Sequence, residues 1–174
     1  MKAHVLRPLD PEAAAEREWV ALGMHLTLVE VAGDAGGEEY PLAWTRARLA
    51  SFLDPAQHTA QVYLAVEEGS GAGAEAIAGH TILRIDSHPS GVRYGLFSTT
   101  YVRPDARRHG LADRLLERGE QWIREHGLDE AATWTSAANV KLIRLYEKHG
   151  YAITESGMNG EHRMVRLTKA LAVA

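Results

Sequence analysis

The chain has 174 residues, a formal net charge of −4 and no cysteine. This length predicts a single domain, residues 1–174, whose core is large enough to fold without disulfides or metals. The lack of cysteine excludes thiolate metal sites and a cysteine nucleophile, and favours a cytoplasmic location. The acidic balance argues against a nucleic-acid binder, and no apolar run approaches the ~20 residues of a membrane span.

Apolar periodicity, with glycine and proline as punctuation, divides the chain into short elements. Asp10-Pro11 favours the start of a first helix, and Gly33 with Gly36-Gly37 predicts that this helix ends in a flexible loop. Met158-Asn-Gly160 is typical of a type I′ hairpin. Strands mixed with helices predict a mixed α/β sheet that has helices on both faces. The predicted strands are 3–7, 61–66, 76–85, 93–102, 131–136, 151–154 and 163–167, and the predicted helices are 11–31, 41–53, 111–126 and 139–149.

One glycine motif in the first half imitates a nucleotide site. Gly69, Gly71 and Ala74 match G-x-G-x-x-A, the dinucleotide fingerprint, and follow a predicted strand. The fingerprint requires a helix immediately afterwards. Residues 76–85 are instead rich in β-branched side chains and lack helical periodicity, so we reject a dinucleotide site.

The stretch 101–116 joins a predicted strand to a predicted helix through a short basic turn. Arg107, Gly110 and Ala112 fit the pattern R-x-x-G-x-A. The first turn of a helix carries unpaired N–H groups and a partial positive charge, and Gly110 has no side chain to hold a pyrophosphate away from them. The turn therefore predicts a phosphate site built from backbone amides, and the alternative is an ordinary connection with solvated arginines.

Two blocks of sequence resemble the GNAT superfamily of N-acetyltransferases. Its acetyl-CoA loop reads Q/R-x-x-G-x-G/A after a strand that ends in V-x-P, and here Val102-Arg-Pro104 precedes Arg107 to Ala112. Residues 139–151 resemble the downstream segment N-x-x-(A)-x-x-L-Y-x-x-x-G-F/Y, with Leu142 where the family often has alanine. The resemblance covers about 94–169 well, and the first half only in its order of elements.

This resemblance implies a GNAT-like, mostly antiparallel central sheet and an N-acetyltransferase without a metal. The enzyme would transfer an acetyl group directly from acetyl-CoA to the primary amine of a small molecule or peptide. Backbone groups near the end of the strand would bind the pantetheine amides and the oxyanion. The sequence leaves open which amine is the acceptor and whether the protein forms a homodimer. The residues expected to bind the cofactor are Tyr101, Val102, Arg107, Arg108, His109, Gly110, Leu111, Ala112 and Asn139.

Tyr146 is the candidate general acid. It follows Asn139 by seven residues, about two helical turns, so both side chains project from one side of their helix. A phenol with a pKa near 10 stays protonated at neutral pH and can give its proton to a thiolate whose pKa is near 8.5. The alternative is that Tyr146 is a core aromatic residue.

The general base is the point at which the sequence departs from the family. Many relatives carry a glutamate on the strand before V-x-P, whereas this chain has Phe97-Ser-Thr-Thr100. The amine could also arrive already neutral. This departure keeps a second function open, a GNAT-like module that binds acyl-CoA without turnover. The candidate bases are His80, Asp86, His88, Glu155 and His162, or a water held by Ser98, Thr100 or Ser136.

The segment between Arg17 and Arg46 contains no lysine or arginine but several carboxylates. In the family this segment lies beside the acceptor site, so the carboxylates could attract cationic amines. The alternative is a solvated acidic loop. The carboxylates are Glu18, Glu30, Asp34, Glu38 and Glu39.

Overall fold

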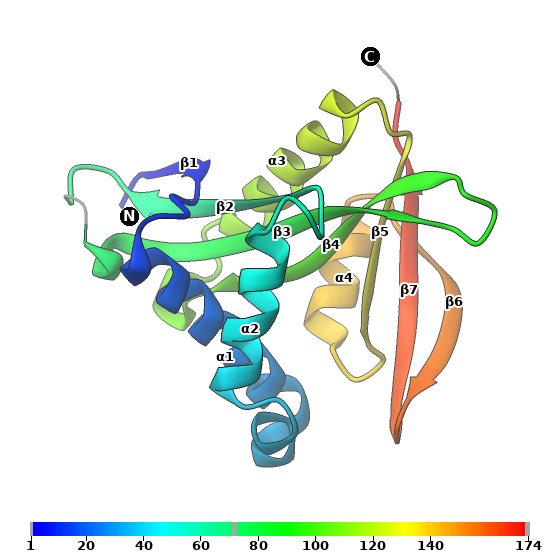
Figure 1. Cartoon of the computed structure of the whole chain (residues 1–174), viewed down its shortest axis with the longest axis horizontal. Coiled ribbons are helices and arrows are strands. Elements are labelled where there is room, and N and C mark those ends of the chain that lie inside the picture. Colours follow the sequence, from blue (N-terminus) through cyan, green and yellow to red (C-terminus); the bar gives the residue numbers. More distant parts are fainter. Residues whose placement is uncertain (1, 71–72, 173–174) are drawn as a thin grey trace.

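The computed structural model describes residues 2–70 and 73–172 (Figure 1). Its strands and helices follow in the predicted order, and two one-turn 3-10 helices are added. The strands are β1 (His4–Pro8), β2 (Ala60–Glu67), β3 (Ile77–Ser87), β4 (Arg93–Val102), β5 (Glu130–Ser136), β6 (Ala152–Asn159) and β7 (His162–Ala170); the helices are α1 (Ala14–Glu39), α2 (Leu42–Leu53), η1 (Ala74–Ala76), η2 (Pro104–Ala106), α3 (Leu111–Glu125) and α4 (Val140–Lys148).

The strands form one seven-stranded sheet in the order β1-β2-β3-β4-β5-β7-β6. Neighbouring strands run antiparallel except β4 and β5, which are parallel. The predicted mixed, mostly antiparallel sheet is therefore confirmed. The single parallel pair lies in the middle of the sheet, between an N-terminal and a C-terminal group of antiparallel strands (Figure 1).

Helices cover both faces of the sheet, as predicted. On one face, α1 and α2 pack against β2 and β3, and one core there includes Met24, Phe52, Val62 and Ile82. On the other face, α3 and α4 cover β3, β4 and β5 with a second core. The period of two along each strand separates the two cores, because successive side chains point to opposite faces. The second core includes Leu83, Phe97, Leu115, Ile123 and Tyr146.

Helix α1 extends beyond its predicted end near residue 31, and the predicted flexible loop is wrong. Gly33 has φ 66° and interrupts the helix, but the chain resumes a helical path as far as Glu39. Gly36 is buried, and a Cβ there would lie 2.6 Å from the Leu28 carbonyl oxygen. This glycine thus lets the segment fold back on α1, a close approach that the sequence pattern alone does not reveal.

The β6–β7 hairpin turns one residue later than predicted. Asn159 still pairs with His162 in the ladder, so Gly160 and Glu161 are the two central residues. Gly160 has φ 62°, whereas Glu161 is not among the residues with positive φ. A type I′ turn needs positive φ at both positions, so this turn has the pattern of type II′.

After the rejected dinucleotide motif, the chain makes only the single turn of η1 and then enters β3. Gly71 of that motif lies outside the described residues. In the described ranges, no helix combines the length and the apolar character needed to cross a membrane.

Candidate active site

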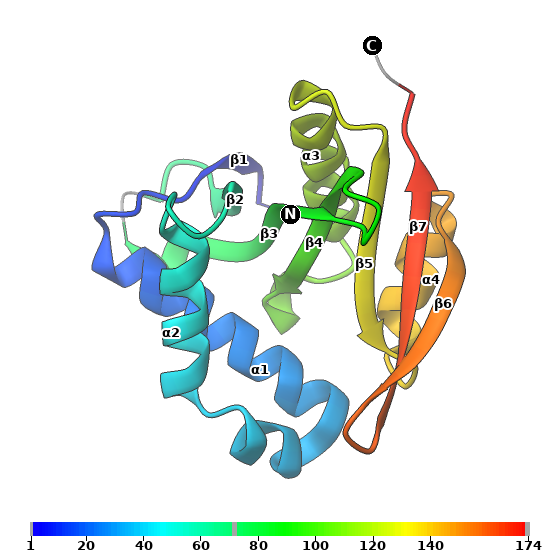
Figure 2. The ribbon, with the colours of Figure 1, turned by 45° about the vertical axis from the view of Figure 1, so that its right-hand side comes forward.

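Strands β4 and β5 pair over a short length and then diverge (Figure 2). Parallel pairing is confined to Gly95–Phe97 opposite Ala131–Thr133. Arg103 donates its backbone N–H to the Ala78 carbonyl of β3. Because the N–H direction alternates along an antiparallel ladder, the N–H groups of Thr100 and Val102 point away from β3, toward the gap. The gap therefore offers, along one wall, backbone donors that no strand of the described residues pairs.

A β-bulge in β4 lies at the mouth of this gap. Ile82 pairs with Thr99 and Leu83 with Phe97, which leaves Ser98 as an extra residue. The bulge breaks the alternation, so Phe97 packs in the α3 core while Thr99, two residues later, faces the α1 side. Ser98, Thr99 and Thr100 consequently all reach one cavity.

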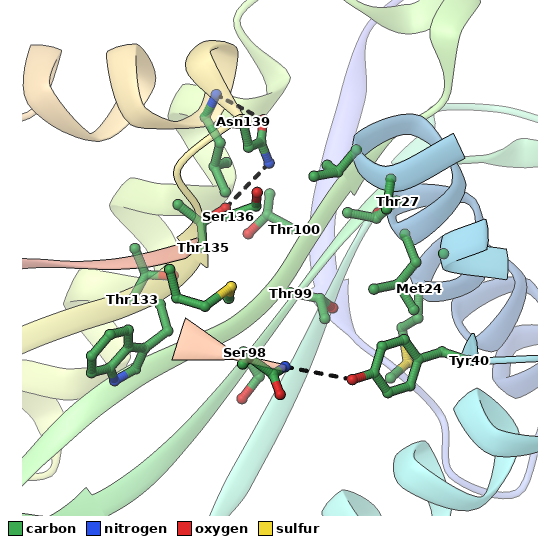
Figure 3. A pocket seen from close by; sticks show the side chains of 18 of the residues that line it. Met24, Thr27, Tyr40, Ser98, Thr99, Thr100, Thr133, Thr135, Ser136 and Asn139 are labelled. Atoms are coloured by element: carbon green, nitrogen blue, oxygen red, sulfur yellow. Dashed lines mark hydrogen bonds between the residues drawn. The ribbon is translucent and has the colours of Figure 1, made fainter. Parts of the chain in front are cut away.

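This cavity of about 460 Å³ lies between the α1–α2 layer and the diverging ends of β4 and β5 (Figure 3). Tyr40, at the end of α1, accepts a 3.5 Å hydrogen bond from Asn159 of the β6–β7 hairpin and bridges the two sides. Apolar side chains of α1, including Met24, form the opposite wall. The residues with a hydroxyl group that line the cavity are Thr27, Tyr40, Thr45, Ser98, Thr99, Thr100, Thr133, Thr135, Ser136 and Tyr146.

Helix α4 brings Tyr146 and Asn139 to the same cavity. Asn139 caps α4, because its side chain accepts from the Leu142 N–H at 3.4 Å and donates to the Thr135 hydroxyl at 3.3 Å. Tyr146 is 1% exposed. Burial raises the pKa of its phenol, although the nearby hydroxyls of Thr133 and Thr100 oppose the shift. The phenol is therefore a neutral hydrogen-bond donor at every physiological pH.

The basic turn leads from β4 to the start of α3. Gly110, the N-cap of α3, has φ 79° and ψ 10°, and Arg108 has φ 67°. In the described part of the chain, the N–H groups of Arg108, His109 and Gly110 find no backbone acceptor. These exposed amides and the start of α3 can bind an anion.

Arg107 is held differently from its neighbours. Its Nε donates to the Val102 carbonyl at 2.8 Å, and its terminal nitrogen lies 2.6 Å from the Glu30 carboxylate on α1. The guanidinium also lies over the Tyr101 ring, 5.6 Å from its centre. The side chain of Arg107 thus fixes the turn against β4 and α1.

The sequence model of the Acetyltransferase (GNAT) family matches residues 28–151. The chain belongs to the GNAT acetyltransferase family. It is accordingly an acyltransferase. Its open sheet, divided at the parallel β4–β5 pair, agrees with this family's fold.

Individual relatives agree with the family assignment. Aminoglycoside N(6')-acetyltransferase type 1 of Serratia marcescens is 30% identical over 111 residues, which cover 63% of this chain and 73% of that protein. A chain of the NatC complex bound to Gag peptide and CoA superimposes with a TM-score of 0.71 and 20% identity, over 98% of this chain and 99% of its own length. A Salmonella typhimurium protein with its cofactor acetyl-CoA has a TM-score of 0.63 and 18% identity, over 98% and 95% of the two chains. The two structures show the shared fold.

The candidate bases of this GNAT chain fall into three groups. The first group lines the cavity and consists of His162, Ser98, Thr100 and Ser136. His162 lies 3.4 Å from the Glu39 carboxylate. Three others lie away from the cavity and are already paired. These pairs are Asp86 with Arg84, His88 with Glu130 and Glu155 with Arg166.

His80 reaches the cavity only through a neighbour. It is fully buried, and its Nε2 lies 2.9 Å from the Thr99 hydroxyl. Burial lowers the pKa of His80 to about 3, so the ring is neutral at physiological pH. Its Nδ1 has no hydrogen-bond partner within the described residues. His80 can therefore orient the Thr99 hydroxyl, which lines the cavity.

The acidic segment of α1 does not form a continuous lining. Glu18 is paired with Arg46 at 2.6 Å, and Glu30 with Arg107. Glu39 is the only carboxylate of the described residues that lines the cavity. The hypothesis of an acidic mouth therefore rests on one residue.

Sequence reasoning missed several residues that line the cavity, notably Thr99, Arg48 and Arg84. Thr99 belongs to no recognisable motif, and the direction of its side chain depends on the bulge. Arg48 and Arg84 come from α2 and β3, which only the folded chain brings together. The sequence offered one weak signal for Arg48 and Arg84, which is that both lie on predicted elements of the first half. The resemblance matches that half only in its order of elements.

Proposed function

We propose that this GNAT protein transfers an acetyl group from acetyl-CoA directly to a primary amine, with both substrates bound together. The observation that carries the proposal is that the gap between the strands and the cavity are continuous. The gap between β4 and β5 opens into the cavity that α1 and α2 close from the other side. A donor in the gap and an acceptor in the cavity would meet beside Thr100 and Tyr146.

The residues present fit acetyl-CoA as the donor. The bound donor would supply a thioester carbonyl for attack by the amine. The N–H groups of Thr100 and Val102, which β5 does not reach, could pair with the amide groups of pantetheine as a further strand would. The free amides of Arg108, His109 and Gly110, with the start of α3, suit its pyrophosphate.

We assign the acid role to Tyr146. The phenol keeps its proton until the thiolate departs and can then donate a hydrogen bond to it; the raised pKa holds the proton on the oxygen and works against its full transfer. The phenol has a fixed direction because the Tyr146 ring packs edge-on against Phe97 and Tyr151, with ring centres 5.7 and 4.8 Å away. A fixed donor loses little entropy when the reaction occurs.

The wall at β4 carries hydroxyl groups where a carboxylate base would stand. We assign the removal of the amine proton to water held by Ser98, Thr100 and Ser136. Thr99, oriented by His80, adds a further hydroxyl at the same place. The same lack of a carboxylate on β4 favours the second candidate function, a module that binds acyl-CoA without turnover.

The acceptor class follows only broadly from the relatives. The curated relative is named for aminoglycosides, and the NatC complex was bound to a peptide. A cavity of about 460 Å³ can accommodate a small molecule or the end of a peptide chain. The proposal therefore includes both kinds of primary amine.

The decisive experiment measures release of CoA thiol from acetyl-CoA with a panel of polyamines, aminoglycosides, amino acids and short peptides. We expect thiol release that depends on both the protein and one class of amine, with acetylated product detected by mass spectrometry. Tight binding of acetyl-CoA with no product from any amine would instead support the binding module.

A further inference from the structure

Two arginines from separate elements lie over the same aromatic ring at one corner of the cavity. Arg48 of α2 and Arg84 of β3 both line it. Their guanidinium carbons lie 4.6 and 5.7 Å from the centre of the same ring, that of Phe52. Nε of Arg84 also donates to the bulged Ser98 at 3.1 Å. The corner is therefore attached directly to the strand that carries the candidate acetyl-transfer site.

The positive charge of this corner is only partly neutralised. Arg84 pairs with Asp86 at 3.2 Å. Among the described residues, Arg48 makes neither an ion pair nor a side-chain hydrogen bond, although it is only partly exposed. Burial and the neighbouring charge of Arg84 lower the pKa of Arg48. Only one of the two guanidinium groups, that of Arg84, thus has a carboxylate partner in the described structure.

Other groups nearby do not supply the missing negative charge. Burial, followed by the charges of Arg84 and Arg48, lowers the pKa of His58, which favours its neutral form. Glu39 lines the cavity but faces His162 of the hairpin, and no ion pair joins it to either arginine in the described structure. The corner consequently has spare hydrogen-bond donors and an excess of positive charge.

We propose that Arg48 and Arg84 bind a carboxylate group of the acceptor, an inference that rests on the proposed function. Guanidinium groups present planar pairs of donors that match a carboxylate. Ser98, which contacts Arg84, lies two residues from Thr100, roughly 7 Å along a strand. The acceptor is then an amine that carries a carboxylate a few bonds away, such as an amino acid or a short peptide with a free C-terminus.

This inference opposes the hypothesis that the acidic segment selects cationic amines. Glu18 and Glu30 are engaged in ion pairs, whereas Arg48 is not. The two ideas predict opposite preferences. A carboxylate on the acceptor should help if the arginine corner selects the substrate, and should hinder if the carboxylates of α1 do.

The experiment compares matched acceptors that differ only in that group: 4-aminobutanoate with 4-aminobutanamide, and glycylglycine with glycylglycinamide. Calorimetry in the presence of CoA gives Kd, and thiol release gives kcat/KM. We expect the parent to bind at least one acid at least tenfold more tightly than its amide. Arg48→Gln should remove that preference and leave the Kd of the amide within twofold of its value in the parent.

Arg46→Gln is the matched control, because Arg46 lies on the same helix but pairs with Glu18 and does not line the cavity. It should keep the preference for the acid. If Arg48→Gln fails to fold, Arg48→Met retains an apolar side chain over Phe52 and should show the same loss.

Equal binding of acid and amide by the parent would overturn the inference, as would a preference that survives in Arg48→Gln or an absence of binding by every acid. The failure of the proposed function looks different. In that case no amine releases thiol, while calorimetry still compares acid with amide and decides whether the corner binds carboxylates.

Discussion

The phenol of Tyr146 lies where the core under α4 meets the cavity, so packing and catalysis make different demands on the same side chain. Its ring is part of the core, and its hydroxyl faces Thr133 and Thr100. Thr133 donates its own hydroxyl to the Phe97 carbonyl at 3.0 Å, independently of Tyr146. Removal of the phenolic oxygen should therefore disturb catalysis more than stability.

We predict that Tyr146→Phe lowers kcat by about 10²-fold, the usual range for a lost general acid. The free energy of unfolding should change by no more than about 1 kcal/mol. Tyr151→Phe is the matched control, because Tyr151 is a buried tyrosine that faces Glu120 rather than the cavity. An unchanged kcat in Tyr146→Phe would assign Tyr146 to the core alone.

His80 gives a prediction about stability. Its pKa is about 3 in the folded protein and about 6.5 when exposed. Between these values only the unfolded chain binds the proton, so stability falls as pH falls from about 6.5 toward 3. Between pH 7 and 5 this one group should lower the free energy of unfolding by about 2 kcal/mol.

Urea unfolding of the parent and His80→Gln at pH 7 and pH 5 isolates this effect. Glutamine does not titrate, and its amide can reach the Thr99 hydroxyl in place of Nε2. From pH 7 to pH 5, the free energy of unfolding of the parent should fall by about 2 kcal/mol more than that of the variant. The same loss in both proteins would mean that the folded state protonates His80 easily.

At the scale of residues, the basic turn predicted where the chain offers free backbone amides. Tyr146 and Asn139 do line one cavity, as their spacing predicts. Their roles, and those of the predicted cofactor-binding residues, stay predictions. The arginine corner was out of reach, because Arg48 and Arg84 become neighbours only when α2 packs on the sheet.

At the scale of elements, the turn before α3 depends on a backbone conformation that favours glycine. Gly110 has φ 79°, and a Cβ there would meet no atom of the described protein within 4 Å. A side chain at this position would therefore strain the backbone without a steric clash inside the protein. It would still occupy the space in which a pyrophosphate should lie.

We predict that Gly110→Val weakens binding of acetyl-CoA at least tenfold, which corresponds to roughly 1.4 kcal/mol. Gly127→Val is the matched control, since Gly127 follows the other end of α3 with φ 71° and equally open surroundings. The control should have a similar backbone strain and should keep its affinity for acetyl-CoA, measured by calorimetry. Parent-like affinity in folded Gly110→Val would place the pyrophosphate elsewhere.

Element order and type followed from periodicity and turn residues, but details that depend on tertiary contacts did not. The second part of α1 approaches its first part so closely that a Cβ at position 36 would lie 2.6 Å from the Leu28 carbonyl oxygen. The bulge at Ser98 has no local sequence signal, yet it directs Thr99 and Thr100 into the cavity. Local propensity cannot report such features, because they are set by neighbouring strands.

At the scale of the whole molecule, function depends on a sheet that is interrupted in its middle. Two antiparallel groups of strands meet through three paired positions of β4 and β5 and then separate. The resemblance predicted this mixed sheet, although it could not show how short the parallel contact is. That the chain forms a single domain stays a prediction, and whether it forms a homodimer stays open.

The proposed function requires that the gap between β4 and β5 receives the donor. Backbone amide NMR during titration with CoA tests it most directly, because each amide reports its own surroundings. We expect the largest shifts at Thr100 and Val102, in the turn 108–110 and in the first residues of α3. Shifts confined to other elements, or saturation of the protein with CoA while these amides stay unchanged, would contradict it.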